Sequence, residues 1–101
     1  AMEELVKVGA DTFVRVGTSG AMQPDIEVGD LGVISGAIRD EGTTLHYLPV
    51  EFPAVADIDV TRALAVGARS TGKTVHVGIS QSKDSFYGQH EPGRIPVARR
   101  L

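Results

Sequence analysis

The sequence predicts an α/β fold built on a mixed, mostly parallel sheet. Helix-like and strand-like segments alternate along the chain, short connections join them, and glycine-containing turns follow strand-like segments. The chain has 101 residues, of which 42% are apolar and 23% are charged, which is the ordinary composition of one globular domain. Disorder and fibrous repeats are therefore excluded, and one modest hydrophobic core is expected.

The first half of the chain contains one predicted helix and two predicted strands. Residues 1–9 carry a loosely helical apolar stripe that ends at a glycine. Residues 12–16 are β-branched and aromatic, so they predict a buried strand that runs into a turn at residues 17–20. Residues 31–38 predict a second strand, rich in valine and isoleucine although two glycines interrupt it.

The second half begins with a segment of no clear period and continues with the clearest helix. Residues 39–56 contain two prolines and are predicted to be mostly loop. Asp57 or Asp59 can serve as the N-cap of a helix whose apolar and small residues follow a three-four spacing, and Gly72 lies at its end.

A third strand and a polar loop complete the pattern. In residues 74–80 Val75, Val77 and Ile79 alternate with Thr74, His76 and Gly78, and residues 81–93 are predicted to be a polar loop that carries Phe86 and Tyr87. Ligands of parallel α/β sheets bind beyond the carboxyl ends of the strands. Residues 17–20 and 81–94 are therefore the places where a site is expected.

Composition excludes several classes of function. The net charge of −3 argues against non-specific nucleic-acid binding, and Arg94, Arg99 and Arg100 are too few to reverse it. The absence of cysteine excludes disulfides and thiolate metal sites, and no stretch has the roughly 20 apolar residues of a membrane span. His46 and His76 lack the spacing of zinc ligands, so no metal is expected. A soluble, intracellular (cytoplasmic) protein is expected.

Both ends of the sequence predict a piece of a longer protein. The chain opens on a helical pattern with no N-cap residue before it, and it closes on the beginning of another helix. Residues 1–101 are therefore expected to form an incomplete single α/β domain.

The stretch from Gly67 to Thr74 matches the pattern of a phosphate-binding P-loop. A true P-loop follows a strand and opens a helix, so that the helix N-terminus faces the phosphate. Here Gly67 lies inside the predicted helix, Gly72 lies at its end, and Lys73-Thr74 begins a predicted strand. We therefore interpret this stretch as a helix C-cap followed by a solvent-exposed lysine.

Arg15 is the more informative charged residue, because a charge in a strand predicted to be buried requires a partner. Thr18, Ser19 and Gly20 follow it with two hydroxyls and several backbone N–H groups, which would suit an oxyanion or phosphate. The alternative is that Arg15 pairs with a structural carboxylate and that the residues after it form only a turn.

Residues 86–89 place aromatic rings and an amide in a predicted loop. Phe86 and Tyr87 could stack on a planar ring, and the amide of Gln89 can both donate and accept a hydrogen bond. The alternative is that these aromatic residues only anchor the loop. No serine has the flanking glycines of a nucleophile elbow, so covalent catalysis has no support.

Several stretches resemble uridine phosphorylases. Residues 13–24 (Phe-Val-Arg-Val-Gly-Thr-Ser-Gly-Ala-Met-Gln-Pro) look like the phosphate-binding strand and turn of that family, and Val28-Gly29-Asp30 follows at the expected place. Residues 46–49, 51–57 and 82–89 are similar to the family's middle portion, in the same order. The resemblance covers essentially the whole chain, although the family's chains are more than twice as long.

This resemblance implies a three-layer α/β/α nucleoside-phosphorylase fold and a homo-oligomer, in bacteria a hexamer. The implied reaction cleaves uridine with phosphate to uracil and ribose 1-phosphate, without an organic cofactor. The 101-residue chain alone is expected to be inactive, because the family's upstream glycine loop and its downstream Glu-Met-Glu segment, which grips the ribose hydroxyls, are absent from it.

The resemblance also assigns residues to the two substrates. Arg15 and Thr18 would bind phosphate and act in catalysis, with Thr18 also near the ribose. Base and ribose would be bound by Thr18, Ser19, Gly20, Phe86, Gln89 and Arg94. Many relatives have an arginine two residues after the glutamine, where this chain has Glu91, so Arg94 is the nearest substitute.

Two other functions stay open at the level of sequence. One is a purine nucleoside phosphorylase or nucleosidase of the same superfamily, although Gln23-Pro24 and residues 86–89 favour the pyrimidine branch. The other is a non-catalytic ligand-binding domain that keeps Arg15 and its turn without chemistry.

Overall fold

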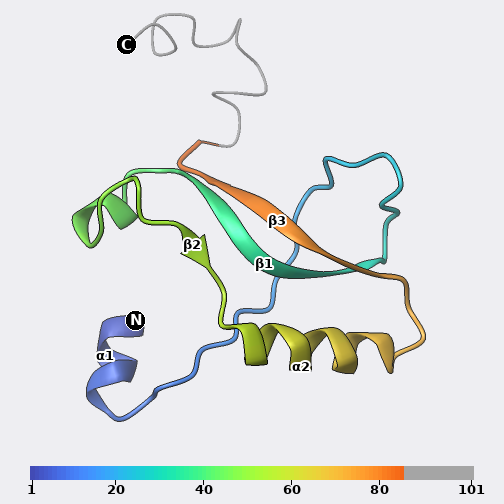
Figure 1. Ribbon diagram of the computed structural model, residues 1–101, viewed down its shortest axis with the longest axis horizontal. Coiled ribbons are helices and arrows are strands. Elements are labelled where there is room, and N and C mark those ends of the chain that lie inside the picture. Colours follow the sequence, from blue (N-terminus) through green and yellow to red (C-terminus); the bar gives the residue numbers. More distant parts are fainter. Residues whose placement is uncertain (86–101) are drawn as a thin grey trace, which may run out of the picture.

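The computed structural model describes residues 1–85, which form two α-helices, one 3₁₀ helix and a small sheet (Figure 1). The helices and strands, in chain order, are α1 (Met2–Lys7), β1 (Leu31–Asp40), η1 (Thr44–His46), β2 (Ala54–Val55), α2 (Ile58–Arg69) and β3 (Val75–Lys83). This arrangement confirms the predicted α/β class. No helix among the described residues is long and apolar enough to cross a membrane.

The sheet has the strand order β2-β1-β3, with β1 in the centre. β1 pairs in parallel with β3 and antiparallel with the two-residue β2, so the sheet is mixed, as predicted. The register between β1 and β3 skips Ser35, which forms a β-bulge after Ile34. The Ser35 hydroxyl donates a hydrogen bond to the carbonyl oxygen of Gly78 at 3.2 Å.

The helix α2 begins and ends at local signals in its sequence. The Asp57 carboxylate accepts a hydrogen bond from the amide of Val60 at 2.9 Å and so caps the helix N-terminus. Gly72 follows the helix with a φ of +80°, a conformation that glycine adopts without steric cost. The chain then reverses into β3, and α2 packs against both β1 and β3.

The core of the described part lies between α2 and the two long strands. Val33 of β1 and Ala65 of α2 are its buried hydrophobic residues, with 6% and 7% of their surfaces exposed. Gly36 is also buried, at the point where β1 lies between β2 and β3. A Cβ atom there would lie 3.0 Å from the Ala54 carbonyl oxygen, so glycine allows the strands to approach closely.

The structure corrects two predictions and extends a third. Residues 12–16 are not a buried strand: they are exposed and irregular, because none of the described strands runs beside them to complete their backbone hydrogen bonds. Part of the predicted loop 39–56 is regular, since it contains η1 and β2. The third strand continues to Lys83, where we predicted a loop, because its pairing with β1 continues to Asp40.

Candidate functional site

The candidate site lies at the carboxyl ends of β1 and β3. These strands are parallel, so their ends meet at one edge of the sheet, where Arg39 is in register with Ser82 and Asp40 with Lys83. This is the edge at which parallel α/β sheets bind ligands. Residues 41–53, here called the 41–53 loop, leave β1 at this edge and return through β2 (Figure 1).

Two side-chain hydrogen bonds join the ends of the strands. The Gln81 amide donates to a carboxylate oxygen of Asp40 at 2.9 Å, and the backbone N–H of Gly42 donates to a carboxylate oxygen of Asp84 at 2.9 Å. Both bonds connect β3 or the residue after it to β1 or the 41–53 loop. The edge also carries a hollow of about 410 Å³, lined by Gln81, Lys83, Asp84 and Ser85.

Arg39 holds the 41–53 loop through its guanidinium group. The side chain is half-buried, and its three nitrogens all donate hydrogen bonds into the loop. The acceptors are the hydroxyl of Thr44 at 3.0 Å and the carbonyl oxygens of Leu48 at 2.9 Å, Pro49 at 2.5 Å and Phe52 at 2.5 Å. One side chain therefore fixes the course of nine consecutive residues.

Two carboxylates hold the 41–53 loop, one at its start and one at its middle. Glu41 accepts hydrogen bonds from the hydroxyl and the amide of Thr44, which hold the pKa of Glu41 below its ordinary value, with a smaller effect of the nearby Arg39 charge. The Tyr47 hydroxyl donates to the carboxylate of Glu3 in α1, and this bond raises the pKa of the tyrosine. Glu41 therefore orders the start of the loop from within, and Tyr47 connects the loop to α1.

Arg15 folds back onto the turn that follows it. A Cβ atom at Gly17 would lie 3.6 Å from Nη2 and 3.7 Å from Cζ of Arg15, so the guanidinium lies against the turn. Arg15 and the turn residues Thr18, Ser19 and Gly20 are exposed to solvent. No hydrogen bond or ion pair joins Arg15 to another described residue, so the alternative of a structural carboxylate partner finds no support within residues 1–85.

Of the predicted site residues, Arg15, Thr18, Ser19 and Gly20 lie among the described residues. No hydrogen bond connects residues 17–20 with residues 81–85 at the carboxyl end of β3. Phe86, Gln89 and Arg94, predicted to bind the base, lie outside the described residues.

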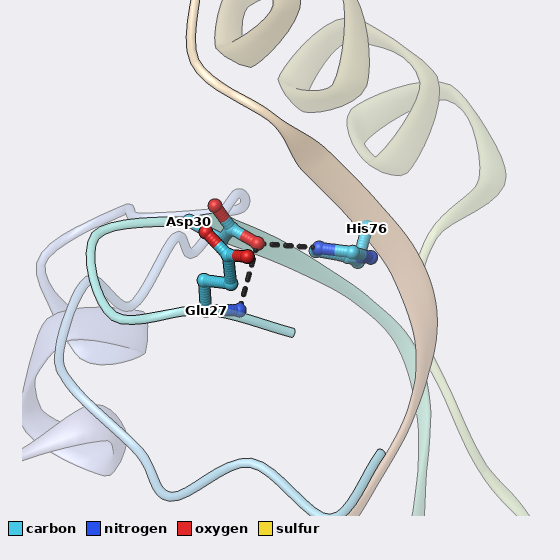
Figure 2. A network of polar contacts seen from close by, with 3 residues as sticks. All are labelled: Glu27, Asp30 and His76. Atoms are coloured by element: carbon cyan, nitrogen blue, oxygen red, sulfur yellow. Dashed lines mark hydrogen bonds and ion pairs between the residues drawn. The ribbon is translucent and has the colours of Figure 1, made fainter. Parts of the chain in front are cut away.

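A polar network that the sequence analysis missed lies at the opposite edge of the sheet (Figure 2). One carboxylate oxygen of Asp30 binds the His76 ring at 2.8 Å and accepts from the Glu27 amide at 3.0 Å. The Glu27 bond and then the His76 bond lower the pKa of Asp30. His76 therefore joins the turn before β1 to β3. The sequence signal for this network was an aspartate directly before one predicted strand and a histidine within another.

The prediction for the P-loop-like stretch, Gly67 to Thr74, is confirmed. Helix α2 ends at Arg69 and β3 begins at Val75, so Gly67 lies inside the helix and Gly72 lies between the helix and a strand. A helix C-terminus presents carbonyl oxygens and partial negative charge, which repel a phosphate. Within residues 1–85, no group of three or more histidine, aspartate or glutamate side chains could hold a metal ion.

Comparison with known proteins gives the family. The family model of the phosphorylase superfamily matches residues 1–99. The chain belongs to this superfamily. The α/β fold, with its small mixed sheet and packed helix, is therefore a phosphorylase-superfamily fold.

Curated members of the superfamily share about half of this chain's residues. The uridine phosphorylase of Thermococcus kodakarensis is 56% identical over 94 residues, which cover 92% of this chain and 34% of that protein. The uridine phosphorylase of Treponema pallidum is 53% identical over 100 residues, covering 99% of this chain and 39% of that protein. A guanosine phosphorylase of Halorubrum lacusprofundi is 46% identical over 91 residues, with coverages of 90% and 38%.

These comparisons confirm the resemblance to uridine phosphorylases. They also set its extent, since this phosphorylase-superfamily chain spans between a third and two fifths of the length of these three relatives.

Proposed function

We propose that the protein carrying this chain is a uridine phosphorylase, a pentosyltransferase that cleaves uridine with phosphate to uracil and ribose 1-phosphate. The observation that carries the proposal is the identity of 50–56% to uridine phosphorylases from four organisms, over 90–99% of this chain. The Arg15 turn adds a physical reason, because it supplies a cation and several hydrogen-bond donors to an anionic co-substrate.

Arg15 and Thr18 are the proposed phosphate-binding residues. The guanidinium of Arg15 lies against Gly17, and Thr18, Ser19 and Gly20 follow directly in the chain with two hydroxyls and their backbone N–H groups. Both Arg15 and the turn are exposed and accessible to phosphate. Phosphate held there would place negative charge beside the ribose and stabilise the cation-like sugar that forms as the glycosidic bond breaks.

The proposed base and ribose site consists of Ser19 and Gly20 beside Thr18, and of Phe86, Gln89 and Arg94. Phe86 would stack near ribose and base, and Gln89 would bind the carbonyl and N–H groups of uracil. Hydrogen bonds from Gln89 and an arginine would stabilise the uracil anion as it leaves. The reaction then needs no covalent intermediate and no organic cofactor.

The resemblance extends the proposal to architecture. Residues 1–101 would be the central part of one α/β domain in a three-layer α/β/α phosphorylase. The enzyme would be a cytoplasmic homo-oligomer, a hexamer made of three dimers.

A test is phosphorolysis by the protein expressed from the complete open reading frame that encodes this chain. Uracil release should require both uridine and phosphate. Arg15→Ala should reduce kcat/KM for phosphate roughly 10- to 150-fold, which corresponds to a charge-assisted hydrogen bond of about 1.5–3 kcal/mol. Arg62→Ala, which removes the same charge from the exposed face of α2, is the control and should leave the kinetics unchanged. A folded Arg15→Ala variant with normal phosphate kinetics would refute the assignment.

A second candidate activity is purine nucleoside phosphorolysis. The 46% identity to a guanosine phosphorylase favours it specifically. Parallel assays with uridine, guanosine and inosine separate the two activities. A kcat/KM for guanosine or inosine above that for uridine would replace the first proposal by the second.

A further inference from the structure

Arg39 lies at the edge of the sheet where a ligand is expected, but its hydrogen bonds are made to the protein's own loop. It is the penultimate residue of β1, at the carboxyl edge of the parallel pair, where a ligand site of this fold class is expected. Yet all its described hydrogen bonds point into the 41–53 loop, toward one hydroxyl and three carbonyl oxygens. A guanidinium used in this way shapes backbone instead of binding an anion.

We propose that Arg39 is a positioning residue, which sets the 41–53 loop as one wall of the nucleoside site at the carboxyl ends of β1 and β3. The inference rests on the proposed function and deepens it. In this proposal the loop contacts the base and the sugar of the nucleoside, and it does not contact the phosphate.

The first support is the connection between the loop and the sheet edge. The Gly42 amide at the start of the loop donates to the Asp84 carboxylate directly after β3, at 2.9 Å. Glu41 orders the next residues by accepting from the amide of Thr44 at 3.0 Å. The loop that Arg39 shapes is therefore also joined to the strand that leads into residues 86–89.

The second support is the chemistry of the loop surface. Leu48, Val50 and Phe52 expose 43%, 60% and 52% of their surfaces. Val50 and Phe52, together with Arg39, line a shallow groove of about 280 Å³ between the loop and the end of β1. An apolar wall with no free cation suits a pyrimidine ring or a sugar face better than a phosphate.

The third support is the geometry of the guanidinium. Its nitrogens reach acceptors on residues 44, 48, 49 and 52, and only a planar, branched donor reaches all of them at once. A lysine at this position keeps the charge but has a single nitrogen. Arg39→Lys therefore separates the positioning of the loop from the charge of the site.

The test compares Arg39→Lys with wild type and with Arg62→Lys, a control on the exposed face of α2. All three proteins come from the complete open reading frame, and KM is measured separately for uridine and for phosphate. A misplaced wall should lower kcat/KM for uridine by roughly 100-fold, since positioning errors of about 1 Å have effects of this size. The KM for phosphate should not change. Equal effects on both substrates, or none, would overturn the proposal.

Amide hydrogen exchange gives a readout independent of activity. In Arg39→Lys the Gly42 and Thr44 amides should exchange faster than in wild type, while the amides of α2 keep their rates. Unchanged loop exchange would overturn the positioning role. A wild type without phosphorylase activity would refute the proposed function, and exchange would still report on Arg39.

Thr44→Val keeps the proposal testable if the Arg39 variant fails to fold. This substitution removes the hydroxyl that accepts from Arg39 Nε at 3.0 Å and donates to the Glu41 carboxylate, and it leaves the other three bonds of Arg39 in place. It should lower kcat/KM for uridine by a smaller factor than Arg39→Lys, again without a change in the KM for phosphate. A folded Thr44→Val variant with wild-type uridine kinetics would overturn the proposal.

Discussion

Replacing Gly36 by alanine should destabilise the sheet at its centre. A Cβ atom at this position would lie 3.0 Å from the Ala54 carbonyl oxygen and 3.1 Å from Cδ1 of Ile79. Rotation of the Ile79 side chain can relieve the second contact. The first is with the backbone of β2, so the strand itself would have to move by a few tenths of an ångström. Overpacking of this kind costs about 1–3 kcal/mol.

Urea unfolding followed by circular dichroism measures the loss as a lower free energy of unfolding at an unchanged m-value. Gly32→Ala is the matched control, because it lies in the same strand, its φ is not positive, and no heavy atom lies within 4 Å of the added Cβ. That substitution should be neutral or stabilise the protein by about 0.4–1 kcal/mol. A Gly36→Ala protein as stable as wild type, or equal losses in both variants, would refute the reasoning.

Three further outcomes are expected. Asp57→Ala removes the acceptor of the Val60 amide at the start of α2, so the free energy of unfolding should fall by about 0.5–2 kcal/mol; an unchanged urea midpoint would contradict the cap. The hydrogen bond from the Glu27 amide lowers the pKa of Asp30 below its ordinary 3.8, so its stabilising effect should be complete above that value and lost as the pH falls through the lower folded pKa. Urea midpoints of wild type and Asp30→Asn should be measured as the pH is lowered from above 3.8, and the variant should lack the part of the acid-induced fall that Asp30 causes. An equal fall of the midpoint with pH in both proteins would contradict this. The P-loop-like stretch should bind no nucleoside triphosphate, so calorimetric titration with ATP should show no binding; ATP binding that Lys73→Ala abolishes would contradict this.

The elements that could be predicted from the sequence are those whose signals are local. Helix α2 begins at the predicted cap Asp57, and Gly72 follows it with the positive φ that such a position favours. The two long strands were predicted because residues 31–38 are rich in valine and isoleucine and because apolar β-branched residues alternate along residues 74–80. Residues 12–16 have the same composition, yet they form no strand, because strand formation depends on a neighbour that composition does not reveal.

The candidate site was predictable only in part. The edge of the sheet followed from the alternation of elements, and the exposed turn after Arg15 is as accessible as a phosphate site requires. The role proposed for Arg39 had no signal in the sequence, since three of its four acceptors are backbone carbonyls, which every residue supplies. The assignments of Phe86, Gln89 and Arg94 stay predictions.

The bulge at Ser35 determines on which face of the sheet the Arg39 side chain lies. In an unbroken strand, Val33 and Arg39 are six residues apart and share a face. Here Val33 is in register with Val77 and Arg39 with Ser82, five positions further along β3, which puts them on opposite faces. Deleting Ser35 would therefore turn the Arg39 side chain to the other face of the sheet and break its four hydrogen bonds, although Arg39 and the four acceptor residues stay unchanged. One extra residue in β1 thus sets the register of all the residues that follow it in the strand.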